Sequence, residues 1–283
     1  MKAIDLQTQM TTKKGALFPK ALKASFEVTF KTKIPYYQTE EEMMQVFRDA
    51  GIKAIFLVPT PADFKKMGEI GVYAAKLKDD YPDVVYGSWA AYNPGMNIDK
   101  YVTELEKYID NFGSFGIFYY GASTGVPAND EKLFPIYELC ANKKVPVKIS
   151  VGHTALGAGM AGGMGIRLGT ERPIPNIDDV AAKFPKLTII AAHCPWPFHS
   201  EMISVMIHKG NVYNEVHGWS PKYFPEELKR ETNSRLKNKI MFGSDYPFFS
   251  YERLFGDWDA EGYKPEVMQN IFYKNAERVF GIK

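Results

Sequence analysis

Eight short apolar runs, each followed by a segment with helical spacing, constrain the fold of this chain more than any other feature. Runs without polar alternation are typical of strands buried on both faces in a parallel sheet. The runs end at glycine, proline or polar residues, as strands do. They are Ala3–Gln7, Ala54–Val58, Val84–Ala90, Phe115–Tyr120, Val145–Ser150, Leu187–Ala192, Asn211–Val216 and the apolar part of Lys239–Pro247.

Helical segments are predicted between these runs. The clearest begins at Thr39 with a cap and three early acids and ends at Gly51. Since no linker interrupts the alternation, we expect a single-domain (β/α)8 TIM barrel over residues 1–283. An open doubly wound sheet would carry a glycine-rich turn after its first strand, and Gln7-Thr8-Gln9 is not one. The other predicted helices cover 62–79, 97–111, 129–143, 178–184, 200–208, part of 225–236, and 265–280.

Two long loops interrupt this regular pattern. Residues from about Thr11 to Thr39 are predicted as a polar, basic loop. A glycine-rich loop from Gly152 to about Pro175 follows the fifth strand, and its glycines would let it move as a lid.

Charge and cysteine content narrow the class of protein. A net charge of +2 gives no general attraction to nucleic acid or to anionic lipid. The two cysteines, Cys140 and Cys194, fit a reducing cytoplasm, and no apolar run is long enough to span a bilayer. We therefore expect a cytoplasmic protein that binds a small-molecule substrate, not nucleic acid or a membrane. A homodimer is expected on general grounds.

The carboxyl ends of barrel strands converge on one pocket, where barrel enzymes do their chemistry. Three of the five histidines, His153, His193 and His217, fall at such ends. His193 and Asp245 are a candidate acid/base pair, because a carboxylate within reach holds the tautomer of an imidazole. Ser150 could complete a Ser-His-Asp arrangement, although a buried serine bonded to the backbone is the ordinary alternative.

Aromatic and cationic residues would line the same pocket. Arg167 and Arg172, in the glycine-rich loop, could pair with a substrate carboxylate or could equally lie on the surface. The aromatic residues at strand ends could form flat walls or belong to the core. They are Trp89, Tyr92, Tyr119, Tyr120, Trp196 and Trp219, with His217 beside them.

Five segments carry a family resemblance: Gly152–Gly159, Asp178–Pro185, Ile190–Pro197, Gly218–Tyr223 and Phe242–Pro247. They are similar to the amidohydrolase superfamily. Within it they resemble the amidohydrolase-2 group, which includes aminocarboxymuconate-semialdehyde decarboxylase, resorcylate-type decarboxylases and lactone hydrolases. The resemblance covers nearly the whole chain and is strongest from Pro146 to Pro247. It implies a metal-assisted barrel enzyme that cleaves C–N, C–O or C–C bonds of small, often aromatic or unsaturated carboxylates.

The metal-ligand positions of that family are changed here. Its Asp-x-His-x-His frame reads Asp5-Leu6-Gln7-Thr8-Gln9, and its histidine on the fifth strand falls on Ser150. The resemblance implies that His193 is its catalytic base and Asp245 its aspartate on the eighth strand. Amide and hydroxyl oxygens bind Zn²⁺ poorly, so we expect no cofactor, with Zn or Mn as the alternative. A bound metal would use His193, Asp245, Gln7 and Gln9, or a rebuilt site with His153, Glu215 and His217.

These residues predict a hydrolase that works without a tightly bound metal. Water activated by His193, with Asp245 orienting it, would open a lactone, a β-diketone or an activated ester. Gln7, Gln9 and Ser150 would stabilise the oxyanion. A decarboxylase of an aromatic or muconate-like acid is the first alternative, and a non-catalytic small-molecule-binding protein is the second. The remaining substrate-binding candidates are His153, Trp89, Tyr120, Arg167, Arg172, Trp196, Glu215 and His217.

Overall fold

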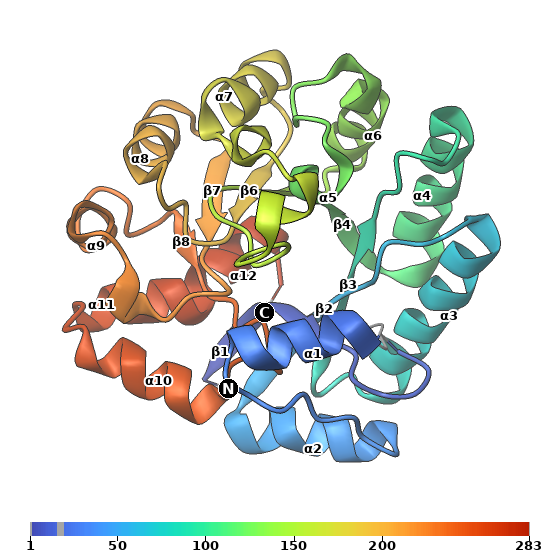
Figure 1. Ribbon diagram of the computed structural model, residues 1–283, viewed down its shortest axis with the longest axis horizontal. Helices are drawn as coiled ribbons and strands as arrows, with labels where there is room; N and C mark the ends of the chain where they lie inside the picture. Colours follow the sequence, from blue (N-terminus) through green and yellow to red (C-terminus); the bar gives the residue numbers. More distant parts are fainter. Residues whose placement is uncertain (1, 16–19, 283) are drawn as a thin grey trace.

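Eight parallel strands form the centre of the computed structural model, which describes residues 2–15 and 20–282 (Figure 1). Each strand pairs with the next along the chain, and each coincides with one of the apolar runs, so the predicted TIM barrel is confirmed. The strands are β1 (Ala3–Gln9), β2 (Ile52–Leu57), β3 (Val85–Ala91), β4 (Ser114–Tyr119), β5 (Val147–Ser150), β6 (Ile189–Ala192), β7 (Val212–Glu215) and β8 (Ile240–Met241).

Backbone hydrogen bonds close the barrel between its first and last strands. Leu6 N donates to Phe242 O at 3.2 Å, and Asp245 N donates to Gln7 O at 2.8 Å. Relative to β2, strand β1 carries an extra residue between Asp5 and Thr8. Bulges of this kind re-aim side chains beside active sites. This closure brings the polar end of β1 next to the segment that follows β8.

Helices surround the barrel (Figure 1). The α2 helix shows why the ends were predictable, since Thr39 and Glu42 form a capping box and Gly51 ends the helix at φ 71°. The α-helices are α1 (Lys20–Thr29), α2 (Glu40–Ala50), α3 (Phe64–Asp80), α4 (Ile98–Phe112), α5 (Gly121–Thr124), α6 (Phe134–Lys143), α7 (Pro173–Lys183), α8 (His199–His208), α9 (Glu226–Thr232), α10 (Tyr251–Ala260), α11 (Pro265–Gln269) and α12 (Asn275–Phe280). Shorter turns are η1 (Glu131–Leu133), η2 (Ala161–Gly165), η3 (Leu168–Glu171), η4 (Pro221–Tyr223) and the π-helical η5 (Asn270–Lys274).

The first loop departs from the prediction. Within the span from Thr11 to Thr39, residues 16–19 lie outside the described part, and the α1 helix follows them. This helix has no acid in its first turn and no base in its last, so its sequence lacks the usual end signals. It is held by tertiary contacts instead, since the Phe26 ring of the helix packs edge-on against Phe248, with ring centroids 5.0 Å apart. In Figure 1, α1 crosses in front of β1 and β2.

The barrel interior has its own apolar core, distinct from the layer between strands and helices. At one end, Phe280 of α12 packs against Trp89 with ring centroids 6.0 Å apart. Residues of this inner cluster include Ile4, Leu6, Ile55, Trp89, Phe118, Ile190 and Met241. Because these residues fill the barrel, ligands can enter only at the carboxyl ends of the strands. Within the described ranges, every helix is too short or too polar to cross a membrane.

Candidate active site

A cavity of about 750 Å³ opens at the carboxyl ends of the strands. That volume lies in the usual range for small-molecule sites. Aromatic side chains form a large part of its walls, and polar side chains at the strand ends form its floor. The wall residues include Phe26, Phe30, Tyr92, Phe118, Tyr120, Trp219, Phe248 and Phe249, and the floor residues are Gln7, Gln9, His153, His193, His217 and Asp245.

His193 and Asp245 follow β6 and β8 in an unusual backbone conformation. Their φ angles are 79° and 57°, in the left-handed region that residues with a Cβ seldom occupy. Such strain is characteristic of functional positions. A Cβ added at Gly218 would lie 3.4 Å from His193 Cδ2 and 3.8 Å from Asp245 Oδ2. The glycine therefore keeps the space between the two side chains open.

Burial sets the protonation of these groups. It lowers the pKa of His193 and of His217 well below the usual value, so both imidazoles are neutral at pH 7. Burial also raises the pKa of Asp245 to about 7, against the opposing effect of a hydrogen bond from Gln9. The cavity floor therefore presents neutral imidazoles together with a carboxyl group that can hold a proton near neutrality.

The carboxylate that holds an imidazole is Glu215, not Asp245. His217 Nδ1 lies 2.6 Å from Glu215 Oε2, and His217 N donates to Glu215 Oε1 at 2.8 Å. Asp245 Oδ1 instead accepts a hydrogen bond from Gln9 Nε2 at 3.3 Å. Within the described ranges, no hydrogen bond joins the predicted pair, His193 and Asp245. His193 packs against His217 with ring centroids 4.1 Å apart.

The three expected oxyanion donors differ in position. Gln7 and Gln9 both line the cavity. The Gln7 side-chain oxygen accepts a hydrogen bond from Lys148 Nζ, and among the described residues no group accepts from the Gln7 NH₂ group, which can therefore donate to a ligand. The Ser150 hydroxyl is buried and donates to Tyr119 O at 3.4 Å, and Ser150 is not a lining residue. Its ordinary structural role therefore replaces the Ser-His-Asp arrangement considered from the sequence.

Some of the aromatic candidates line the cavity and others lie outside it. Tyr120 lines the cavity, as His153 does. Trp89 lies beneath the floor, fully buried, and its indole nitrogen donates to Leu6 O at 2.8 Å. Trp196 is 43% exposed and packs on Trp219 outside the cavity, with ring centroids 6.0 Å apart.

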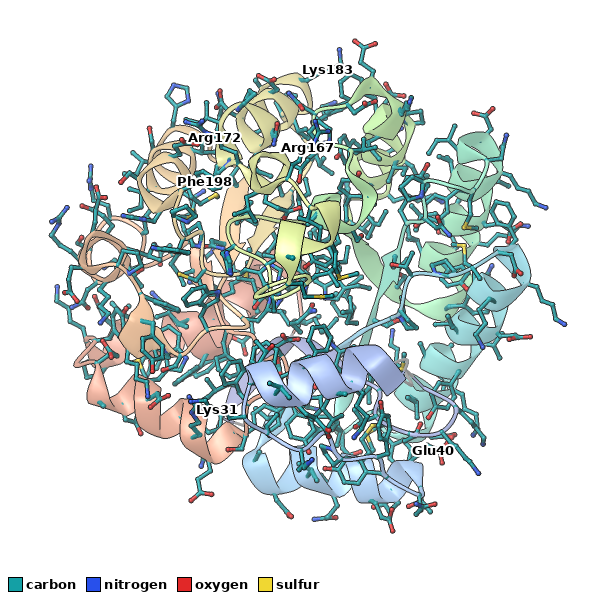
Figure 2. The ribbon with its side chains drawn as sticks, viewed as in Figure 1. Lys31, Glu40, Arg167, Arg172, Lys183 and Phe198 are labelled. Atoms are coloured by element: carbon teal, nitrogen blue, oxygen red, sulfur yellow. The ribbon has the colours of Figure 1, made fainter. Side chains whose placement is uncertain are left out.

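The cations at the cavity are not the ones that the sequence suggested. Arg172 Nε binds Glu201 Oε1 at 2.8 Å on the surface, and Arg167 does not line the cavity. Figure 2 shows both arginines on the side of the barrel where α7 lies, with Arg172 near Phe198. Lys31 and Arg253 line the cavity instead. Neither follows a strand directly, so the rule of strand ends could not find them.

Lys148 is a further buried residue that is absent from the predicted site. It lies on β5 with its side chain fully buried inside the barrel. Burial lowers its pKa to about 8, with the nearby Glu215 opposing the shift, so the ammonium group stays charged at neutral pH. A single lysine inside the apolar run Val145–Ser150 was the available signal.

The described residues do not fit a divalent metal at the family's ligand positions. Within residues 2–15 and 20–282, no group of three or more His, Cys, Asp or Glu side chains is placed to hold a metal ion. The Gln7 oxygen already binds an ammonium group, whose charge would repel a cation. The Gln9 amide nitrogen donates to Asp245, so only the Gln9 amide oxygen, a weak ligand for Zn²⁺, is left for a cation.

Comparison with known proteins shows the family to which the chain is similar. The family model described as amidohydrolase matches residues 69–282, more than half of the sequence. No curated protein matches the chain.

Three solved structures show the same fold. An uncharacterised TIM-barrel protein from Bordetella bronchiseptica is 19% identical, with a TM-score of 0.78 over 99% of each chain. The 5-carboxyvanillate decarboxylase of Sphingomonas paucimobilis is 13% identical, with a TM-score of 0.69 over 100% of this chain and 99% of its own. The 4-oxalomesaconate hydratase of Rhodopseudomonas palustris is 18% identical, with a TM-score of 0.63 over 99% of this chain and 95% of its own.

Proposed function

We propose that this chain, which belongs to the amidohydrolase family, hydrolyses an acyl C–O or C–C bond of a small, flat cyclic substrate. Lactones, β-diketones and activated esters are the substrate classes. The proposed reaction needs no tightly bound metal. One observation carries it: on the polar floor of the cavity, neutral His193 and the Asp245 carboxyl group, which holds a proton near pH 7, both lie within 4 Å of the point that a Cβ at Gly218 would occupy.

The proposed reaction uses these groups in sequence. An imidazole of the His193–His217 pair takes a proton from water, and the oxygen adds to the acyl carbon. The carbonyl electrons move to oxygen, where the Gln7 NH₂ group stabilises the oxyanion. The acyl bond then breaks, and neutral Asp245 gives its proton to the leaving oxygen or carbon. The imidazolium proton finally returns to the Asp245 carboxylate, so the net reaction consumes one water.

Substrates that are already electrophilic suit such a site. A metal ion contributes several kcal/mol by polarising a carbonyl, and fixed hydrogen-bond donors supply a similar contribution. The aromatic walls favour a planar, unsaturated ring. Lys31 and Arg253 at the cavity favour a substrate that also carries a carboxylate.

Decarboxylation of an aromatic acid is the second candidate. The solved structures of similar fold include decarboxylases of 5-carboxyvanillate and of 2,6-dihydroxybenzoate. A neutral Asp245 could also supply the proton that replaces the carboxyl group on a ring carbon. Hydrolysis and decarboxylation would both use protonated Asp245 as the acid. The two reactions can therefore be distinguished only by their products.

A substrate panel tests the proposal. Lactones, β-diketones, phenolic esters and hydroxybenzoates are offered to chelator-treated protein, with proton release and carbon dioxide release followed in parallel. We expect proton release without carbon dioxide, and no gain from added Zn²⁺ or Mn²⁺. Asp245→Asn should lower turnover by at least about 100-fold, whereas the exposed control Asp79→Asn should not.

Three outcomes would contradict hydrolysis without metal. Carbon dioxide release from hydroxybenzoates alone would establish the decarboxylase. Activity that chelation removes and Mn²⁺ restores would refute the metal-free site. Binding that raises the melting temperature, with no conversion of any compound, would indicate a non-catalytic binding protein.

A further inference from the structure

Lys148 lies directly under the floor of the cavity, where it links β1, β5 and β7. Its ammonium donates to Leu6 O at 2.8 Å and to the Gln7 side-chain oxygen, and it lies 3.5 Å from Glu215 Oε2. It also lies 4.8 Å from the centroid of the Trp89 ring. Each of the three N–H groups of the ammonium thus faces one oxygen atom. These contacts hold the positive charge of Lys148 in one place inside the barrel.

Glu215 is the counter-charge, and it in turn binds His217. Its side chain is fully buried; Oε1 accepts a hydrogen bond from His217 N, and Oε2 lies 2.6 Å from His217 Nδ1. A buried carboxylate without a cation would be protonated. Burial raises the pKa of Glu215, and the Lys148 ammonium opposes that shift and favours the carboxylate. A carboxylate can only accept, so Glu215 in this form requires His217 Nδ1 to carry the proton.

The other ring nitrogen of His217 therefore has a free lone pair. Within the described part of the chain, no protein group hydrogen-bonds to His217 Nε2. His217 is one of the residues that line the cavity. His193 lacks this arrangement, because no described carboxylate hydrogen-bonds to its ring. The two stacked imidazoles are consequently not equivalent.

We infer that Lys148 and Glu215 are positioning residues, and that they make His217 the general base of the proposed hydrolysis. This inference rests on the proposed function and assigns the base within its imidazole pair. Lys148 acts on the oxyanion donor as well, since binding the Gln7 oxygen leaves the Gln7 NH₂ group free. The Lys148 ammonium thus orients both the proposed general base, His217, and the proposed oxyanion donor, Gln7.

The charges balance through the step. With neutral His217, the set of Lys148, Glu215 and His217 carries no net charge. When His217 Nε2 takes a proton from water, the set becomes +1 while the hydroxyl addition makes the substrate oxygen −1. The two new charges form together inside a cavity of low dielectric, where their attraction is strong. Lys148 therefore balances the charge of Glu215 throughout the step, and it neither gains nor loses a proton itself.

The tautomer of His217 can be measured without a substrate. In protein labelled with ¹⁵N-histidine, the chain gives five imidazole signal sets, and the set missing from His217→Asn is assigned to that residue. We expect a neutral ring at pH 7, protonated at Nδ1 and bare at Nε2. A ring protonated at Nε2, or a charged imidazolium, would overturn the inference.

Removing the cation tests its role. In Lys148→Met, Glu215 either takes a proton and donates it to Nδ1 or pairs with an imidazolium, so the neutral Nδ1–H form should disappear. Lys53→Met is the matched control, since Lys53 is also on a strand and lies 5.3 Å from the Tyr86 ring centroid, but on the outer surface. An unchanged His217 signal in Lys148→Met would refute the inference.

Glu215→Gln is the second variant and serves if Lys148→Met does not fold. In the wild type one carboxylate oxygen accepts from His217 N and the other from Nδ1. Glutamine has only one oxygen, so its NH₂ group must face Nδ1 when the backbone bond is kept. The ring should then switch to the Nε2–H tautomer. Retention of the Nδ1–H form would contradict the positioning role of Glu215.

Kinetics separate this inference from the proposed function. On a hydrolysed substrate, His217→Asn and Glu215→Gln should each lower kcat by at least about 100-fold with little change in KM, and His193→Asn should lower it less. Hydrolysis at the wild-type rate in His217→Asn would reject His217 while leaving the function intact. Borohydride trapping of a carbonyl substrate on Lys148 would also reject the inference, because it would make the lysine a nucleophile.

Discussion

Replacing Gly243 with alanine tests the architecture beneath the cavity. Gly243 follows β8, and a Cβ placed there would overlap Glu215 Oε1, lie 2.6 Å from Glu215 Cδ and lie 2.9 Å from His217 Cβ. Its backbone is not left-handed, so the requirement for glycine is steric. The β8 strand can therefore pass the Glu215 carboxylate only if the residue at 243 has no side chain.

The expected cost follows from these contacts. Non-bonded carbon atoms need a separation of about 3.5 Å, so the carboxylate must retreat by about 1 Å from the new methyl group. That retreat disturbs the 2.6 Å contact with His217 Nδ1 and the 3.5 Å contact with Lys148. Overpacking costs about 1–3 kcal/mol, and disrupting a buried charge pair costs about 3–5 kcal/mol. Added together, these two costs mean that Gly243→Ala should lower the free energy of unfolding by about 4–8 kcal/mol.

Urea unfolding followed by circular dichroism measures this difference. Gly68→Ala in α3 is the control, because a Cβ there meets nothing within 4 Å, and we expect no loss of stability. In a Glu215→Ser background, Gly243→Ala should cost only the overpacking against His217 Cβ, about 1–3 kcal/mol, since no carboxylate remains to be displaced. A cost below about 1 kcal/mol in the wild-type background, or the same cost in both backgrounds, would refute this reasoning.

Four further predictions concern charge and chemistry. Burial raises the pKa of Asp5 to about 6 from 3.8. The carboxylate form is therefore disfavoured in the fold, and stability from this group is lost as pH rises from 4 through 6. Urea unfolding should show Asp5→Asn gaining up to about 3 kcal/mol relative to wild type between pH 4 and pH 7, and a constant difference would argue against this. Hydrolysis should decline as pH rises through about 7, because Asp245 must hold its proton, and a pH–rate profile of Asp245→Asn should lack that limb. Steady-state kinetics should place Ser150→Ala within about tenfold of wild type, whereas loss of all turnover would restore the serine as a nucleophile. Arg253→Ala should raise KM for carboxylate substrates by about tenfold, the effect of one charge-assisted hydrogen bond, while the ion-paired surface residue Arg172, changed to alanine, should leave KM unchanged.

The sequence determined the barrel and the edge where chemistry would occur. A parallel strand buried on both faces must be apolar along its length, so each strand is recognisable from its own residues. The residue at which each strand ends can also be recognised from the neighbouring sequence. For this reason His193, His217 and Asp245 could be assigned to the cavity. The family resemblance follows from the same strand ends, and the family match over residues 69–282 supports it.

Tertiary structure alone decided which side chains become partners. Lys148 and Glu215 are 67 positions apart, and each by itself looks like an isolated charge in an apolar strand. The α1 helix has no end signals in its sequence, and Phe26 of this helix packs on Phe248, which follows β8. Local propensity and strand-end rules carry no information on contacts between distant segments. Whether an imidazole faces a carboxylate, an amide or another imidazole depends on the stagger and closure of the barrel.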